Sequence, residues 1–414
     1  MRLLVAPHDL EIGGSQINAI DLAAGAAEAG HDVVVYGRPG PLVDHVRARG
    51  VEFVEARRLH YRPAPSRIAQ LAALARQRRL DLIHAYEWPP CLDAYYGAHL
   101  AFGIPLLCTV LSMSVSPLVP RSIPLVMGTE ALGDEARRTH AAPVWVLEPP
   151  IDVAGDHPGI DGAAFRREHG LTGEPMLVVT VSRLAVDLKL DALVQAVDAV
   201  DRLAVRMPVR LAVVGDGPAE AALRDRAAEV NRRHGREVVS LLGAMSDPRP
   251  AYAAADVVVG MGSSALRGLS IGRPVVVQGE QGFSRPFEPE TLPYFLRHGF
   301  WGRADDGWTV QRLADQLERL LSDPQRRAEL GVYGRRTVGE RFSLARAVTH
   351  QLEIYDEVLA RGRRTSSAEA ATAARRAVRV ELDNHDPRRK RARRRMEESL
   401  LAAASRLKDH GAHA

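Results

Sequence analysis

Short apolar runs rich in Val and Leu alternate with helical patterns along most of the chain, and this alternation limits the fold more than any other feature. The runs cover residues 2–7, 32–36, 51–54, 80–84, 105–110, 123–127 and 144–147 in the first half, and 176–181, 210–215, 238–242, 256–259 and 274–278 in the second. Apolar strands separated by helices are typical of a parallel sheet that helices cover on both faces. The sequence therefore predicts an α/β fold of doubly wound parallel sheets.

The alternation is interrupted between residues 148 and 173, where prolines and glycines gather. Such residues indicate a linker. We therefore expect a Rossmann-like domain at 1–147, a linker at 148–173 and a second Rossmann-like domain at 174–341. Two such halves facing each other across a cleft place a ligand between the carboxyl ends of their sheets.

The basic character of the chain belongs to a tail at its C-terminal end. Residues 361–414 hold 15 Lys and Arg against 7 Asp and Glu, whereas the rest of the chain holds 40 against 44. This composition predicts a disordered or partly helical tail. A net charge of +8 favours peripheral contact with an anionic membrane, and a tail that only aids solubility is an equally weighted alternative.

Composition also limits the class of protein. Cys91 and Cys108 lack the spacing of a zinc site, so neither a disulfide framework nor a structural zinc is expected. No run approaches the ~20 apolar residues that span a bilayer, and the N-terminus is typical of a strand rather than a signal peptide. We therefore expect a cytoplasmic protein, with a location peripheral to the membrane if the tail binds lipid.

Two loops that follow predicted strands and open helices contain candidate phosphate-binding groups. Gly13 and Gly14 follow the first strand, where glycines let the backbone approach a ligand and a helix start offers N–H groups to an anion. In the segment VSRLAVDLKL, Arg183 and Lys189 lie on either side of a turn, where two cations can clamp a diphosphate. Lys189 is the only lysine before the tail. A tight turn and two solvated charges are the corresponding structural explanations.

Two further loops have the same strand-to-helix position. The segment VVGDGP contains Gly215, Asp216 and Gly217 at the predicted carboxyl edge of the second sheet, where ligands bind in open α/β folds. Asp216 acting only as a helix N-cap is the alternative. Gly262, Ser263 and Ser264 follow a buried strand and open a helix, so their N–H groups can receive phosphate oxygens.

The order and spacing of these loops resemble those of the family 4 glycosyltransferases of the GT-B fold, over about residues 1–359. The resemblance implies retaining transfer of a sugar from a nucleoside-diphosphate sugar, UDP or GDP, to a carbohydrate, lipid-linked or small-molecule acceptor, with no metal or other cofactor. It implies that Arg183 and Lys189 act on the diphosphate. It also implies donor-binding roles for Gly13, Gly14, Gly215, Asp216, Gly217, Gly262, Ser263 and Ser264. Residues 342–360 resemble the helix of the family that crosses back to the first domain.

The sequence departs from the family pattern in two places. The family has two glutamates separated by seven residues in the fourth loop; here nothing matches the first, and Arg267 stands at the second. Glu280 and Glu288 are possible substitutes. The histidine often found after the fifth strand is also absent, and Leu111 or Ser112 stands nearby.

These departures leave other classes of function open. A non-catalytic nucleotide-sugar-binding subunit is the main alternative, and a GT-B epimerase is a weaker one. A polyanion or nucleic-acid binder using the KRARRR run is disfavoured, because the run lacks interleaved aromatics and the body is acidic. His84, Glu87 and the segment 112–116 are candidate acceptor contacts, and a hydrogen-bonded structural histidine is an equal explanation for His84.

Overall fold

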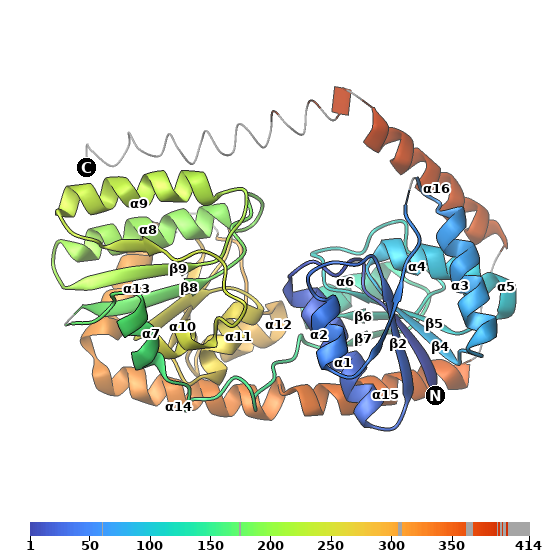
Figure 1. The fold of residues 1–414 in the computed structure, drawn as a ribbon, viewed down its shortest axis with the longest axis horizontal. Coiled ribbons are helices and arrows are strands. Elements are labelled where there is room, and N and C mark those ends of the chain that lie inside the picture. The colour runs from blue at the N-terminus through green and yellow to red at the C-terminus, as the bar shows by residue number, and fades with distance from the viewer. Residues whose placement is uncertain are drawn as a thin grey trace. The chain divides into compact units, whose positions relative to one another are not determined.

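The structure is a computed structural model that describes residues 1–59, 61–173, 175–304, 309–361, 367–386, 388, 389, 391 and 395. It divides into two compact units (Figure 1). Unit 1 is built from Met1–Pro150 and Phe342–Lys390, and unit 2 is built mainly from Ile151–Arg341. Residues 151–173, which the sequence places in a linker, belong to unit 2.

Unit 1 is built on a parallel sheet with the strand order β3-β2-β1-β4-β5-β6-β7. The strands are β1 (Arg2–Ala6), β2 (Asp32–Gly37), β3 (Glu52–Glu55), β4 (Leu82–Tyr86), β5 (Leu106–Val110), β6 (Leu125–Met127) and β7 (Val144–Val146). The helices are α1 (Gly14–Glu28), α2 (Val43–Ala48), α3 (Pro65–Gln77), α4 (Trp88–Ala94), the π-helix η1 (Tyr95–His99), α5 (Leu100–Phe102), α6 (Glu130–Thr139), α15 (Leu344–Arg361) and α16 (Ser367–His385).

Alternate side chains of the inner strands enter different cores, which is why these strands are mainly apolar. In β1, Leu3 and Val5 pack with α1 and α15 on one face of the sheet, whereas Leu4 and Ala6 pack with α3, α4 and α6 on the other. Since both faces are covered, the inner strands are largely apolar runs, the pattern seen in the sequence, whereas the edge strand β3 begins and ends with exposed glutamates.

The last two helices of unit 1 come from the C-terminal part of the chain. Helix α15 lies so close to α1 that a Cβ on Gly25 would be 2.2 Å from the Val348 side chain. Part of the predicted tail forms helix α16, in which Ala373 and Ala377 are buried against a small apolar cluster of unit 1. The described part of the tail is therefore helical, and it is docked rather than solvated on all sides. Residues 396–414 lie outside the described residues.

Unit 2 has a second sheet with the order β10-β9-β8-β11-β12-β13. Its strands are β8 (Met176–Val181), β9 (Val209–Val214), β10 (Val239–Leu241), β11 (Val257–Gly260), β12 (Val275–Gln278) and β13 (Ser284–Pro286). Its helices are α7 (Gly162–Glu168), α8 (Leu190–Ala204), α9 (Glu220–His234), α10 (Arg249–Ala254), α11 (Ser263–Ser270), α12 (Leu292–His298), α13 (Val310–Ser322) and α14 (Pro324–Arg341). Strand β13, which the sequence analysis missed, pairs antiparallel with β12 at the edge.

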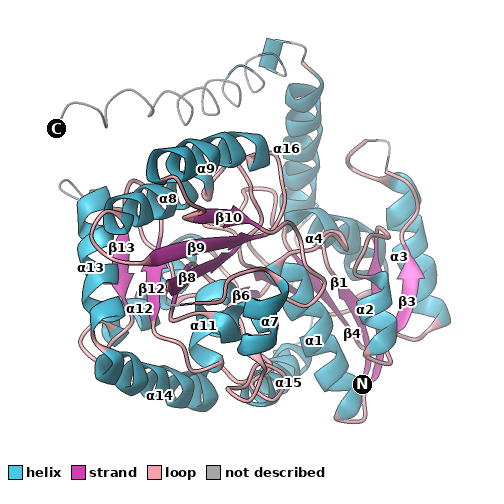
Figure 2. Ribbon diagram, turned by 60° about the vertical axis from the view of Figure 1, so that its left-hand side comes forward, coloured by secondary structure: helices cyan, strands magenta, loops and turns pink. Residues whose placement is uncertain are grey.

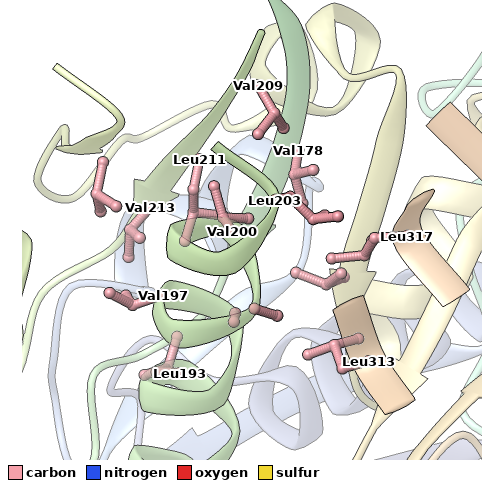
Figure 3. Close-up of a cluster of buried hydrophobic side chains, with 14 of the residues drawn as sticks. Val178, Leu193, Val197, Val200, Leu203, Val209, Leu211, Val213, Leu313 and Leu317 are labelled. Carbon is pink, nitrogen blue, oxygen red and sulfur yellow. The ribbon is translucent and has the colours of Figure 1, made fainter. Parts of the chain in front are cut away.

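Helices cover both faces of the second sheet as well (Figure 2). Helix α8 places an apolar side chain on the sheet at nearly every turn, including Leu193, Val197 and Val200, and α13 adds Leu313 and Leu317 to the same core (Figure 3). On the other face α11 packs closely on the strands. A Cβ added at Gly268 would lie only 3.0 Å from the Val258 side chain. Each unit is therefore doubly wound, as predicted.

Candidate active site

Three of the candidate loops meet at the carboxyl edge of the unit 2 sheet. The strand order reverses between β8 and β11, so the loops after these two strands diverge, and open α/β sheets bind ligands at such a point. The Ser264 hydroxyl donates to the carbonyl of Val181 at the end of β8 over 2.7 Å. The Leu184 amide donates to the carbonyl of Asp216 over 2.7 Å. The structure thus brings the second, third and fourth loops together.

The basic pair lies in the loop after β8. Lys189 is half-buried at the N-terminal boundary of α8, and Arg183 is exposed. Burial, with a contribution from the Arg183 charge, lowers the pKa of Lys189 to about 8. Among the described residues neither side chain has a carboxylate partner. Two neighbouring cations without a carboxylate between them favour the binding of an anion.

The backbone before Lys189 is strained. Leu188 has a φ of +63° and a side chain that is 43% exposed. A non-glycine residue in this region of backbone space is uncommon, and such residues cluster at functional sites. The strain supports the interpretation of this turn as part of a binding site.

The glycines of the third loop hold the second loop in place. Gly215 has a φ of +140° and Gly217 a φ of +146°. A Cβ on Gly215 would lie 1.9 Å from the carbonyl oxygen of Ser182, and one on Gly217 would lie 2.6 Å from that of Leu184. Only glycine allows this approach. Asp216 does not cap a helix, because no side chain caps the first turn of α9.

The residues of the fourth loop, Gly262, Ser263 and Ser264, have different surroundings. The Ser264 hydroxyl is used inside the unit, since it donates to β8 and receives a hydrogen bond from Tyr252 over 3.0 Å. Gly262, the N-cap of α11, has a φ of +59°, and a Cβ there would have no neighbour within 4 Å. Ser263 is the first residue of the helix, and no side chain caps this helix start. The Gly262 amide donates to the carbonyl of Phe300 over 2.6 Å, so the N–H groups that this helix start can offer to a phosphate begin at Ser263.

Gly13 and Gly14 open helix α1 in unit 1. No side chain caps this helix. Gly13 is extended, with a φ of −168°, so its backbone does not require glycine. A Cβ at this position would instead meet the Gln16 side-chain oxygen at 2.4 Å. The glycine thus makes room for Gln16, a buried side chain that the sequence analysis did not single out.

Gln16 connects two polar groups in the loop after β1. Its amide donates to Asp9 over 2.9 Å and lies 3.1 Å from the Nε2 atom of His8. His8 Nε2 is 3.5 Å from the Asp9 carboxylate, and the His8 side chain is 31% exposed. This cluster stands at the carboxyl edge of the unit 1 sheet, next to the reversal of strand order between β1 and β4. In the sequence, this cluster could have been found from the consecutive residues His8 and Asp9 directly after the first strand.

His84 and Glu87 have structural partners in unit 1. His84 is buried between the Tyr355 hydroxyl and the Thr109 hydroxyl, each 2.7 Å away. Burial lowers the pKa of His84 to about 3, so it is neutral and fixes α15 to the sheet. The Glu87 carboxylate accepts hydrogen bonds from the amides of Leu111 and Ser112. The structure therefore favours the interpretation of His84 as a hydrogen-bonded structural histidine. The Glu87 carboxylate holds the backbone of the segment that follows β5.

Comparison with known proteins assigns the family. The model for Glycosyltransferase Family 4 matches residues 12–123, in unit 1, and the model for Glycosyl transferases group 1 matches residues 175–323, in unit 2. The two matches lie in the order that the resemblance requires. The chain belongs to the family 4 glycosyltransferases.

Individual relatives support this assignment. A D-inositol 3-phosphate glycosyltransferase of Thermobispora bispora is 28% identical over 87% of this chain and 93% of its own length. A GDP-mannose-dependent alpha-(1-6)-phosphatidylinositol monomannoside mannosyltransferase of Mycolicibacterium smegmatis is 32% identical over 46% of this chain and 50% of its own length. Among solved structures, Anabaena HepE in complex with UDP has a TM-score of 0.70 at 18% identity, covering 86% of this chain and 100% of that one. The chain is thus a glycosyltransferase with the GT-B fold.

In this family 4 glycosyltransferase, Arg267 has a partner in unit 2. Its guanidinium lies 3.6 Å from the Asp156 carboxylate. Asp156 is buried, and desolvation raises the pKa of its carboxyl group. The position at which the family pattern has its second glutamate is therefore occupied by an arginine that a buried acid holds.

The two possible substitutes for the missing glutamates are also engaged in ion pairs. Glu280 accepts from the Arg303 guanidinium over 2.7 Å, and Glu288 accepts from Arg326 over 2.7 Å. Glu280 follows β12, and the amide of Gly282 in the same loop bonds to Asp191 in the first turn of α8. Glu280 thus lies on a loop that contacts the helix of Lys189, whereas Glu288 is tied to α14.

Neither a metal site nor a membrane span is evident in the part of the chain that the structure describes. There, no group of three or more His, Cys, Asp and Glu side chains could hold a metal ion. None of the described helices is both long and apolar enough to cross a bilayer. Metal-independent transfer remains a prediction.

Proposed function

We propose that this glycosyltransferase transfers a sugar from a nucleoside-diphosphate sugar to an acceptor with retention of configuration and without a metal. The observation that carries the proposal is the pair Arg183 and Lys189, two cations that have no carboxylate partner among the described residues and that lie at the carboxyl edge of the unit 2 sheet. A diphosphate is the part of such a donor that this pair fits, because it offers oxygens to a bidentate guanidinium and to a compact ammonium. HepE, which was solved with UDP, supports a nucleotide ligand for this fold.

The leaving group is the natural target of these residues in the reaction. As the glycosidic bond to the diphosphate breaks, negative charge grows on the phosphate oxygens. Arg183, Lys189 and the backbone N–H group of Ser263 at the start of α11 stabilise that charge, and fixed donors of this kind supply a large part of catalysis in many enzymes. Glycine at 215 and 217 keeps the cationic loop at the required position.

The acceptor class follows from the relatives rather than from the site. The relatives named above act, by their names, on D-inositol 3-phosphate and on a phosphatidylinositol mannoside. We propose a phosphoinositol-containing acceptor, free or lipid-linked, and either UDP or GDP as the nucleotide.

A non-catalytic nucleotide-sugar-binding subunit is the second candidate. Arg267 at the position of a family glutamate, held by Asp156, favours it, as does the pairing of Glu280 and Glu288 with arginines. Such a subunit binds the donor but does not turn it over.

The two candidates differ in turnover. Mass spectrometry of nucleotides retained on purified protein selects the donors, and hydrolysis and transfer are then measured with UDP- and GDP-sugars, with and without EDTA. We expect transfer in EDTA that Arg183→Ala abolishes. Binding without turnover over the whole panel supports the non-catalytic subunit, and activity that EDTA removes and Mn²⁺ or Mg²⁺ restores contradicts the metal-free mechanism.

A further inference from the structure

Helix α16 is fixed on unit 1 by polar contacts as well as by its buried alanines. The Tyr96 hydroxyl donates to the carbonyl of Ala370 over 2.6 Å. The Glu369 carboxylate accepts from the amide of Ser122 over 3.1 Å. Since these contacts act on one side of the helix, they determine which side faces away from unit 1.

The outward side of α16 combines apolar and basic residues. Arg375, Val378, Arg379 and Leu382 are three or four positions apart, a spacing that places them on one face of a helix. Val378 is 46% exposed and Leu382 is 69% exposed. The outward side of the helix therefore offers two exposed apolar side chains next to two arginines.

The charge on this face is not balanced within the helix. The carboxylates of α16 have partners: Glu369 bonds to unit 1, Asp383 lies 2.9 Å from Arg389, and Glu381 lies 3.7 Å from His385. Within the described chain, neither Arg375 nor Arg379 has a carboxylate partner. The sequence that follows, residues 386–414, adds 9 Lys and Arg against 4 Asp and Glu.

We propose that the outward face of α16 docks on an anionic lipid surface. The helix would lie parallel to the surface, with Val378 and Leu382 between the headgroups and the two arginines extended to the lipid phosphates. A helix of this kind gains from apolar burial and from attraction to anionic lipid together. A nucleic acid would satisfy the arginines but would leave Leu382 exposed, so lipid is the better match. This binding does not depend on the transfer reaction.

The test is co-sedimentation of the full chain with vesicles of phosphatidylcholine in which about three lipids in ten are phosphatidylserine, and with phosphatidylcholine alone. We expect binding to the anionic vesicles only, weakened as salt shortens the Debye length. The double variant Arg375→Gln/Arg379→Gln should bind about 30-fold more weakly, since each basic residue near such a surface contributes about 1 kcal/mol. Val378→Ser/Leu382→Ser should also lose binding at low salt.

A matched control removes the same charge elsewhere. Arg138 on α6 and Arg232 on α9 are exposed, so Arg138→Gln/Arg232→Gln should leave vesicle binding almost unchanged. All three variants change outward-facing residues, and unaltered thermal unfolding would verify that they fold. The proposal is overturned if the full chain ignores anionic vesicles at low salt, or if the control pair loses as much binding as the α16 arginines. It also fails if a DNA duplex, rather than the vesicles, binds the wild type and is lost in the α16 variants.

Discussion

At the scale of single residues, Arg183 and Lys189 are the most informative positions. Removing either side chain should weaken UDP or GDP binding by about 1.5–3 kcal/mol, the usual contribution of a hydrogen bond to a charged group. Folding should be intact, because neither residue has a carboxylate partner in the described chain. Calorimetric titration of Arg183→Ala and Lys189→Ala checks this. Unchanged affinity for both nucleotides in both variants would rule out the diphosphate assignment.

The pKa of Lys189 predicts how affinity depends on pH. In the free protein its pKa is lowered to about 8, and a bound diphosphate should raise it, because an anion stabilises the charged form. The free protein is therefore fully protonated at Lys189 well below pH 8. We expect nucleotide affinity to fall as the pH rises from about 7 to above about 8, with proton uptake on binding.

Calorimetry at pH 8.5 in buffers of different ionisation enthalpy measures this proton uptake. In Lys189→Arg the uptake should disappear, because arginine stays protonated throughout this range. Equal affinities at pH 7 and pH 9 in the wild type would contradict the prediction.

At the scale of elements, the loop after β9 determines the position of the loop after β8. Gly215→Ala should disrupt both folding and nucleotide binding, since its φ of +140° is unfavourable for alanine and the new Cβ would meet the Ser182 carbonyl. Backbone strain of this type costs about 1–3 kcal/mol, and the clash adds to it. Gly235→Ala is the matched control, because Gly235 has a φ of +60° but open space around it. A Gly215→Ala protein as stable as this control and with normal affinity would show that the loops are not coupled.

A second element-scale prediction concerns the attachment of α15. His84 is neutral in the folded protein, with a pKa of about 3, whereas its unfolded pKa is about 6.5. Its stabilising contribution is thus complete above about pH 6.5 and is lost as the pH falls towards 3. We expect the unfolding free energy of the wild type to decrease with acid more steeply than that of His84→Gln, by up to ~1.4 kcal/mol per pH unit. Chemical denaturation between pH 4 and 7 measures the difference, and identical slopes would contradict the role of His84.

At the scale of the whole molecule, the packing of α16 on unit 1 predicts that removing the C-terminal tail changes the stability of the protein. Removal of residues 361–414 would uncover the surface of unit 1 around Leu92 and Leu118, on which Ala373 and Ala377 pack. We therefore expect this truncation to lower the unfolding temperature. Removal of residues 387–414 should leave it unchanged, and nucleotide binding should persist in both, because the proposed donor site lies in unit 2. Differential scanning calorimetry of the two proteins, with nucleotide titration, checks this, and equal melting temperatures would show that α16 does not stabilise unit 1.

Much of the fold could be predicted because it depends on local patterns of apolar residues in the sequence. Strands covered on both faces must be apolar throughout, so the continuous Val and Leu runs reveal the parallel sheets without knowledge of any contact. Strand β13 was missed, because the three residues Ser284–Pro286 at an antiparallel edge need no such run. The sequence did not decide whether the region of α16 is helical or disordered. The helix packs on unit 1 through alanines, which contribute little to a hydrophobic pattern.

The candidate site was predictable in composition but not in the roles of its residues. The sequence alone indicated which loops contain glycines and cations, since parallel strands bring the loops that follow them to one edge. It could not distinguish Gly13, which makes room for Gln16, from Gly215, which approaches the Ser182 carbonyl. It also could not show that Glu280, Glu288 and Arg267 have ion-pair partners, or that His84 is buried against Tyr355, 271 positions away in the sequence. Local sequence determines the elements and their chemistry, but burial and pairing depend on residues that only the folded chain brings together.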